Sequence, residues 1–495
     1  MLSIPSLREK FFFRTVHAGI GGLVLVSAVV LLVKVYCESA DKDSTKSTVH
    51  RPDSTLPLLE NTLDVIRAAR NGDMHDRAVE ICSQYNGEPI LFRSIGMPDQ
   101  LFVSSPEAFE DVLKTQFNNF PKGPYMCKNL EDLLGGGIFA ADGEQWVHQR
   151  KTASNLFTVR TLRDSMTATI QRHAVVLYKR LQDASDSGDT LDLFKLSNRF
   201  TIEAFAEIGF GVCLGSEDDH PFQKAFDHAQ RALLLRFIRP SWFWKAQRWL
   251  NVGVEGELKH DIEAGTVTKH SQGKDIVSLF LESLDGSPNA NALQFDPMYL
   301  RDIVVNFLIA GRDTTAQTLS WFFLYLTKNP RVETVIRNEI MEKLSKVGVD
   351  QADIANATMK DVGQLTYLEA ALRETLCLHP PVPMVPKFVV EDTTLADGTP
   401  VKQSSTIVLA TYAMARMQNV WGEDAAEFKP ERWIDAASGK LINISPFKFA
   451  SFNAGPRLCL GVNLAMLEMK LVVAGLLKSS TLKCKTRRRS RTTCR

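Results

Sequence analysis

The sequence predicts a mainly α-helical protein with a minor β component, preceded by an N-terminal transmembrane helix. Apolar residues recur with helical periodicity through most of residues 144–329. Alternation of apolar and polar residues between turn signals, which is typical of strands, is confined to short stretches. Near the N-terminus, Ala18–Val33 is an uncharged apolar run, AGIGGLVLVSAVVLLV. A chain of 495 residues with 44% hydrophobic residues can also bury a large core.

We expect one large domain with short appendages. Residues 1–36 form the predicted membrane anchor, and residues 37–60 form a polar tether and hinge. No linker rich in Pro, Gly or Ser and no run of charge interrupts residues 61–478, which we assign to a single domain. Residues 479–495 form an atypical basic tail.

The apolar run can be interpreted as a membrane anchor or as a cleaved signal peptide. It extends to Tyr36 if Lys34 reaches the membrane interface, which makes it nearly long enough to span a bilayer. A signal peptide would use Arg8, Lys10 and Arg14 as its basic region. We favour the anchor, because the eight cysteines show no C-x-x-C pairs or regular spacing and suit a reducing compartment. The same argument places the body in the cytosol, although the basic residues before the run favour the opposite orientation.

The charge distribution argues against a nucleic-acid partner. The formal net charge is +1, but the tail alone holds seven cations and no acid. These cations are Lys483, Lys485, Arg487, Arg488, Arg489, Arg491 and Arg495. Subtracting seven from +1 leaves −6 on the rest of the chain, whereas a body that binds nucleic acid needs clustered cations to neutralise phosphates. Only the tail could contact anionic surfaces.

Two regions predict short β structure, and one predicts a long buried helix. Pro89–Val103 alternates apolar and polar residues between turn signals and predicts an antiparallel hairpin. Phe388–Val390 and Thr406–Thr411 flank the turn signal Ala-Asp-Gly-Thr, which suggests another small sheet. Tyr299–Lys328 is apolar on nearly every face yet carries Arg301, Asp302, Arg312 and Asp313. A helix that is apolar all round lies inside a large protein or in a membrane, and the charges favour the protein interior.

The segment FNAGPRLCLG has residue types that suit a cysteine bound to the metal of a flat cofactor. Glycines let the backbone turn tightly and approach such a cofactor closely. Cys459 lies just before a predicted helix, whose N-terminal dipole favours a thiolate, and backbone N–H groups there can donate to the sulfur. The alternative is a buried structural cysteine in a glycine-rich turn. The residues at the fixed positions of F-x-x-G-x-R-x-C-x-G are Phe452, Gly455, Arg457, Cys459 and Gly461.

This segment resembles the signature of cytochrome P450 monooxygenases, in which a cysteine thiolate holds the haem iron. The resemblance covers about residues 61–478 and implies the cytochrome P450 fold. It implies haem b (iron protoporphyrin IX) as cofactor, with Cys459 as the ligand of the iron. It further implies a lipophilic substrate, O2, and electrons that NADPH supplies through a flavoprotein reductase.

Two further segments match the same family. Trp146 and Arg150 have the family's W-x-x-x-R spacing, share one helix face, and could both reach one haem propionate. Arg457 is the expected partner of the second propionate. Taken alone, the W-x-x-x-R pattern usually means a solvated helix face.

The segment AGRDTT, within the long helix, resembles the family's oxygen-activation motif. Ala310 and Gly311 are expected to leave room for dioxygen over the iron. Thr314 offers a hydroxyl, and Asp313 offers a proton relay for cleavage of the O–O bond. The alternative is an Asp-Thr pair that caps or packs a helix.

The sequence departs from the family pattern in two places. Cys377 replaces the arginine of the family's E-x-x-R, so Arg432 alone is expected to hold Glu374. Losing one cation from a buried network can cost about 3–5 kcal/mol, because it leaves a desolvated carboxylate short of partners. In addition, only 36 residues follow Cys459, and their last stretch lacks the strand alternation of the sheet with which relatives normally end.

The local sequences AGRDTTAQTLSW, FAADGEQWVHQRK and PLLENTLD look most like the eukaryotic branch that hydroxylates fatty acids near the terminal methyl group. The resemblance therefore implies a single-pass endoplasmic reticulum enzyme in contact with membrane lipids. Two alternatives remain: a catalytically impaired haem-binding remnant, suggested by Cys377 and the tail, and a haem peroxide isomerase. Asp313 and Thr314 argue against the isomerase, which does not need a proton-delivery pair.

Overall fold

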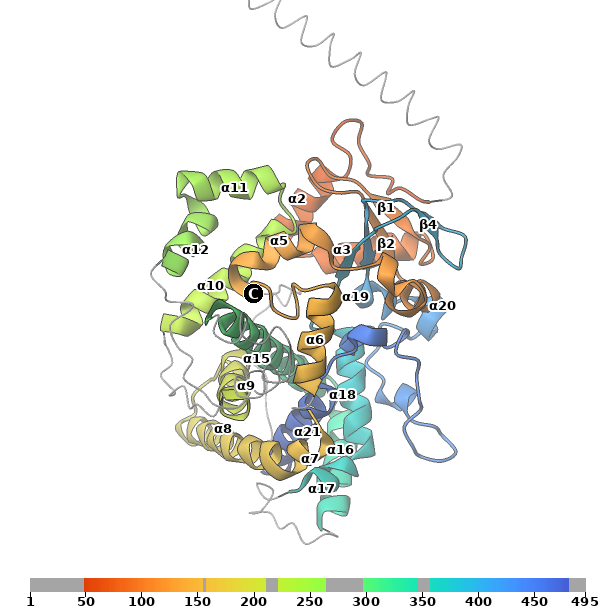
Figure 1. Ribbon diagram of the computed structural model, residues 1–495. Helices are drawn as coiled ribbons and strands as arrows, with labels where there is room; N and C mark the ends of the chain where they lie inside the picture. The colour runs from red at the N-terminus through yellow and green to blue at the C-terminus, as the bar shows by residue number, and fades with distance from the viewer. Residues whose placement is uncertain (1–48, 155–156, 211–220, 264–296, 346–356, 480–495) are drawn as a thin grey trace, which may run out of the picture.

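The computed structural model describes residues 49–154, 157–210, 221–263, 297–345 and 357–479. Within these ranges the protein is mainly helical with two small sheets, as the sequence predicted (Figure 1). The helices are α2 (Thr62–Asn71), α3 (Met74–Gln84), α4 (Pro106–Glu110), α5 (Gly123–Leu134), α6 (Gly143–Ser154), α7 (Val159–Thr161), α8 (Thr167–Ser187), α9 (Leu193–Phe210), α10 (Pro221–Arg236), α11 (Ser241–Leu250), α12 (Gly253–Glu263), α15 (Pro297–Lys328), α16 (Pro330–Ser345), α17 (Met359–Gly363), α18 (Thr366–Leu378), α19 (Thr411–Met414), α20 (Gln418–Trp421) and α21 (Val462–Ser479). Short π or 3-10 turns occupy Asp111–Thr115, Phe117–Asn119, Leu162–Met166, Pro430–Trp433, Ala450–Phe452 and Gly455–Arg457.

The larger sheet joins segments that are far apart in the chain. Its strand order is β1 (Ile90–Phe92), β2 (Gln100–Val103), β6 (Thr406–Leu409) and β3 (Val385–Phe388). The pairs β1–β2 and β3–β6 are antiparallel, and β2–β6 is parallel. The predicted hairpin is confirmed, and the strand predicted at Thr406–Thr411 is present as β6. The strand predicted at Phe388–Val390 lies earlier, at Val385–Phe388, and the strands form one sheet rather than two. The second sheet pairs β4 (Thr393–Thr394) with β5 (Pro400–Val401) around the predicted turn.

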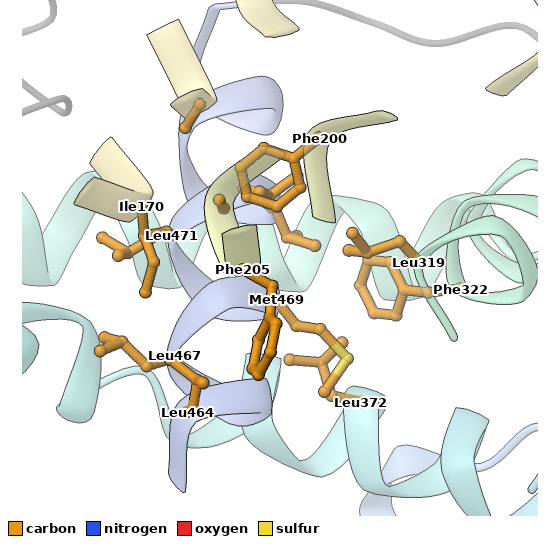
Figure 2. Close-up of a cluster of buried hydrophobic side chains, with 14 of the residues drawn as sticks. Ile170, Phe200, Phe205, Leu319, Phe322, Leu372, Leu464, Leu467, Met469 and Leu471 are labelled. Atoms are coloured by element: carbon orange, nitrogen blue, oxygen red, sulfur yellow. The ribbon is translucent and has the colours of Figure 1, made fainter. Parts of the chain in front are cut away.

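Helix α15 crosses the middle of the helical part, as the pattern of the long helix predicted (Figure 1). It packs against α9, α18, α21 and α5. Figure 2 shows the core between these helices, where Phe200 and Phe205 of α9 lie near Leu319 and Phe322 of α15. Met469 of α21 packs in the same cluster. This packing fixes the middle of α15 relative to the start of α21.

The N-terminal side of the body begins before residue 61. His50 is bridged to Ile90 of β1, and Glu60 is bridged to Ser94 just after β1. No helix within the described ranges is both long enough and apolar enough to cross a bilayer. The predicted anchor at residues 1–36 and the basic tail from residue 480 lie outside those ranges.

Candidate active site

The loop before α21 folds around two close backbone approaches. Gly455 has a φ of +62°, and a Cβ at this position would lie 2.1 Å from the carbonyl oxygen of Leu113. Only glycine fits both the left-handed conformation and this contact. The loop is closed by the N–H of Cys459, which donates to the carbonyl of Phe452 at 2.8 Å. The fixed glycine at position 455 thus holds Cys459 at the N-terminal end of α21.

Cys459 is accessible on one side of this loop, although the loop itself is surrounded by protein. The surrounding protein raises the pKa of the Cys459 thiol, whereas the backbone N–H of Gly461 and the charge of Arg150 act to lower it. An N–H donor and a cation next to a sulfur both stabilise its thiolate form. The site therefore has the groups that a metal-bound thiolate requires.

Trp146 of α6 lies between two guanidinium groups. Arg457 is centred 4.3 Å from the indole ring and Arg150 is centred 5.9 Å from it. Arg150 Nη2 also donates to the carbonyl oxygen of Leu458 at 2.7 Å, which ties α6 to the cysteine loop. The structure thus brings together the three residues that the sequence assigned to the haem propionates.

Two lysines that the sequence analysis missed complete a cluster of cations around Arg457. Lys387 of β3 is 1% exposed, and no residue that the structure describes forms a hydrogen bond or ion pair with its Nζ. Burial and the charge of Arg457 lower the pKa of Lys387 to about 7. Burial, Arg457 and Lys387 likewise lower the pKa of Lys122 well below its usual range. A lysine at the centre of the apolar strand VPKF was the signal that could have identified the first of them.

One carboxylate serves this cluster. Asp142 Oδ1 accepts from Arg457 Nη2 at 2.5 Å, and the backbone N–H groups of Lys122 and Gly123 donate to the two Asp142 oxygens. Arg457 Nε is buried and has no hydrogen-bond partner within the described ranges. Three basic side chains share this one carboxylate, and burial lowers the pKa of both lysines, so a nearby anion would be needed to keep all three protonated. The cluster is therefore suited to an anionic ligand beside Cys459.

The middle of α15 holds the predicted acid and alcohol. Thr314 Oγ1 donates to the carbonyl of Ala310 at 2.8 Å, within its own helix. Asp313 instead turns toward α10, where Gln230 Nε2 donates to its Oδ2 at 2.5 Å. Burial raises the pKa of Asp313, and Arg312 and Gln230 oppose this effect. In this arrangement Asp313 and Thr314 have separate partners.

Gly311 has a packing function that the sequence analysis did not foresee. A Cβ at this position would lie 2.3 Å from Cδ2 of Phe205 in α9. Gly311 was expected to leave room for dioxygen. The structure adds a second reason for glycine at this position, because α9 and α15 approach each other closely here. The preceding residue, Ala310, is partly exposed.

Cys377 replaces the arginine of the E-x-x-R motif, yet Glu374 has more hydrogen-bond donors than the sequence suggested. Glu374 is 1% exposed, and its Oε1 accepts from Arg432 Nε at 2.9 Å and from the N–H of Lys429 at 2.9 Å. Its Oε2 accepts from the indole N–H of Trp433 at 2.7 Å. The expectation that Arg432 alone holds Glu374 was wrong, because two neutral donors from the same turn also reach the carboxylate.

Cys377 lies in a small apolar cluster next to this network. It is 4% exposed and packs with Ala370, Ala415 and Trp433. Burial and the charge of Glu374 raise the pKa of its thiol. Cys377 therefore fills the position of the missing arginine as a neutral, apolar side chain.

The fold and the site define a helical protein with an exposed cysteine at the start of a helix, beside a cluster of basic side chains, which suits a haem-thiolate enzyme. The sequence pattern that defines the cytochrome P450 family matches residues 51–494. The chain belongs to the cytochrome P450 family, whose members are haem-thiolate monooxygenases. The recognition made from the Cys459 segment is thereby confirmed.

Curated relatives match most of the chain. The protein is 38% identical over 407 residues to cytochrome P450 86B1 of Arabidopsis thaliana, covering 75% of this chain and 70% of that protein. It is 36% identical over 454 residues to cytochrome P450 704B1 of the same plant, covering 81% of this chain and 84% of that protein. It is 37% identical over 399 residues to cytochrome P450 94B1, also from Arabidopsis thaliana, with 76% of each chain covered.

The residues of this chain fit the haem that the family uses. Haem b carries two propionates, and their two negative charges would compensate the excess of cations around Arg457. Cys459 would supply the sulfur ligand, while Trp146, Arg150, Arg457 and Lys387 would hold the propionates. The donor set thus contains both the ligand and the counter-charges that the cofactor requires.

Proposed function

We propose that this protein hydroxylates an aliphatic, lipophilic substrate of the fatty-acid class, with Cys459 as the ligand of the haem iron. The observation that carries the proposal is the cysteine loop next to an undercompensated cluster of buried cations. Bound haem supplies the activation of O2 with electrons that a flavoprotein reductase takes from NADPH. The remaining tasks fall to the residues of this chain.

These residues divide the work between cofactor binding and proton transfer. Arg150, Arg457 and Lys387 would hold the propionates by charge, and the Trp146 ring would support the two arginines through cation–π contacts. Asp313 would hold a proton on the α10 side of α15, and the Thr314 hydroxyl would receive it once the Asp313 side chain turns. Glu374 and Arg432 join α18 to the turn Pro430–Trp433 and keep the core assembled around the site.

An aliphatic substrate is supported by the resemblance to fatty-acid hydroxylases and by apolar residues next to the site. Ile309 and Ala310 are partly exposed in the middle of a helix that is otherwise mostly buried. Met384 and Val385, which follow the HPPVP segment, are partly exposed at the start of β3. These side chains offer no polar partner, so a hydrocarbon chain suits them.

We place the enzyme at the endoplasmic reticulum membrane, as a single-pass protein with its body in the cytosol. Support comes from α11, which exposes aromatic residues: Trp242 is 64% exposed and Trp249 is 83% exposed. Tryptophan gathers at membrane interfaces, and the exposed Lys245 on the same helix provides a cation for lipid headgroups. The same surface would adjoin lipid if the apolar run Ala18–Val33 anchors the chain.

The impaired-remnant alternative receives less support, because Glu374 keeps three hydrogen-bond donors despite Cys377. The isomerase alternative receives no support from a site that retains both Asp313 and Thr314.

The test is to express the full chain in microsomes with an NADPH-dependent flavoprotein reductase. We expect the reduced carbon monoxide complex to show the thiolate absorption band and saturated fatty acids of graded chain length to be hydroxylated. Cys459→Ser should abolish the band and the products, whereas Cys82→Ser, a buried cysteine outside the site, should leave both intact. A full thiolate band with no oxidation of any fatty acid would reject the substrate class, and no band at all would reject the proposal.

A further inference from the structure

Helix α10 contacts the acid of α15 through two residues on one face. Asp227 and Gln230 are three positions apart and therefore neighbours on the helix surface. Asp227 Oδ1 lies 2.7 Å from Arg312 Nη2, and Gln230 Nε2 donates to Asp313 Oδ2 at 2.5 Å. Thus α10 reaches both members of the Arg312–Asp313 pair.

One oxygen of the Asp313 carboxylate is hydrogen-bonded, and the other makes only a longer ion-pair contact. Arg312 Nε lies 3.5 Å from Asp313 Oδ1, while Gln230 takes Oδ2. The arginine itself is held from two sides, because Thr201 of α9 donates to its carbonyl at 2.8 Å and its guanidinium lies 5.6 Å from the centre of the Phe226 ring of α10. Asp313 is therefore fixed in an orientation that points toward α10.

Thr314 is turned the other way. Its hydroxyl donates to Ala310 within α15, so Asp313 and Thr314 do not share a hydrogen bond in this orientation. The Asp313 side chain is 32% exposed and Asp227 is 60% exposed, so solvent reaches this side of α15. In this orientation Asp313 can take up a proton from solvent, and its side chain must turn before it can deliver that proton to Thr314.

We propose that Gln230 is a positioning residue that holds Asp313 in its solvent-facing orientation and so links the position of α10 to proton delivery. This inference rests on the proposed role of Asp313 in the monooxygenase reaction. The charged groups that act on Asp313 are Arg312 from its own helix and Asp227 from α10, and the residue from α9 at this point is the neutral Thr201. Gln230 is neutral as well, so it acts on the acid through one hydrogen bond to the ionised carboxylate.

The loss of that hydrogen bond has a defined direction. A donor to a carboxylate stabilises the ionised form, so Gln230→Leu, which removes this donor, raises the pKa of Asp313. Gln230→Glu keeps the shape but places a second carboxylate next to Asp313, and it raises the pKa further. Arg231→Gln changes an exposed residue of the same helix and is the matched control.

The experiment uses the haem-loaded full chain and two readouts. The first is a carbon-13 NMR titration of carboxyl-labelled aspartates, in which Asp313→Asn identifies the signal of Asp313. The second is the pH profile of coupling, the fraction of NADPH electrons recovered in hydroxylated dodecanoic acid, between about pH 6 and about pH 9. We expect both midpoints to move upward in Gln230→Leu, further in Gln230→Glu, and not in Arg231→Gln.

The outcomes separate this inference from the proposed function. An unmoved Asp313 titration in Gln230→Leu overturns the inference, whatever the activity. A moved titration with an unmoved coupling profile also overturns it, provided that Asp313→Asn alters that profile. If Asp313→Asn leaves the coupling profile unaltered, the proposed role of Asp313 fails. If dodecanoic acid is not hydroxylated, the proposed substrate class fails. In either case the NMR titration alone decides whether Gln230 positions Asp313.

Discussion

Truncation of Arg432 tests the network that replaces the family's complete E-x-x-R arrangement. Arg432 lies 2.9 Å from the buried carboxylate of Glu374, and its other nitrogens reach Asp424 and backbone carbonyls. Arg432→Met keeps most of the side-chain volume but removes the only cation that pairs with Glu374 in the described part of the chain. The change therefore leaves a buried charge with neutral donors alone.

The expected cost follows from what remains. Removing one partner of a buried ion pair costs about 3–5 kcal/mol, because the other charge stays desolvated. Lys429 N–H and Trp433 Nε1–H still donate to Glu374 in the variant. We therefore expect a loss of about 3 kcal/mol, at the lower end of that range. Adding Glu374→Gln removes the stranded charge, so the double variant should recover about 1 kcal/mol or more of this loss.

The loss should also depend on pH. Burial raises the pKa of Glu374, and Arg432 is the largest opposing influence, so its removal raises this pKa further. Between the unfolded and the folded pKa, the native state binds more protons than the unfolded state, and stability falls as pH rises. The destabilisation by Arg432→Met should therefore be smaller at about pH 5 than at about pH 8.

The assay is urea unfolding of the haem-loaded full chain, followed by helical circular dichroism. The matched control is Arg331→Met, which breaks an exposed ion pair with Glu431 of 2.6 Å and should cost at most about 1 kcal/mol. A loss for Arg432→Met no larger than that of the control, or one that is the same at both pH values, would refute the reasoning.

Two further predictions concern the cation cluster and the packing of α15. In the folded protein the pKa of Lys387 is about 7, whereas in the unfolded chain it is about 10.4. In the haem-free protein, burial of this lysine should therefore lower the free energy of unfolding most below pH 7 and least above about pH 10.4. A propionate pairs with the protonated lysine, so haem affinity should weaken as pH rises above neutrality. This pH dependence should disappear in Lys387→Met. Equal pH dependence of haem affinity in both proteins would contradict the role of Lys387 as a propionate partner. Gly311→Ala should lower thermal stability by about 1–3 kcal/mol through its clash with Phe205, and Phe205→Leu should restore part of it in a calorimetric comparison. Additive effects of these two substitutions would show that the contact is not the cause.

Local patterns in the sequence predicted the elements of the fold well. Alternation predicted the hairpin of β1 and β2, and the apolar pattern predicted α15 to within two residues at its start. These signals are local, because they depend on the spacing of side chains along one element. The pairing of β2 with β6 was not foreseen, since it joins residues about three hundred positions apart in the chain and depends on register rather than periodicity.

The candidate site was predicted where a motif is contiguous and missed where it is assembled from distant segments. The Cys459 loop and the Trp146–Arg150 helix face are contiguous motifs. Lys387 and Gln230 act on partners from other elements, and neither belongs to the motif that it serves. The motif predicted a small residue at position 311. The side chain that leaves no room for a Cβ there is Phe205, which lies on another helix.

The pairing of buried charges separates structural residues from ligand-binding residues in this protein. Glu374 is buried with three donors, so its network is complete in the protein alone. Lys387 is equally buried, yet within the described ranges it lacks a hydrogen-bonded anion, and its neighbour Arg457 keeps one unpaired nitrogen. A buried charge without a partner is costly, so its retention is explained by a ligand that supplies the missing charge. By this criterion the cations near Cys459 belong to the cofactor site, and the Glu374 network, despite the loss of its second arginine, belongs to the scaffold.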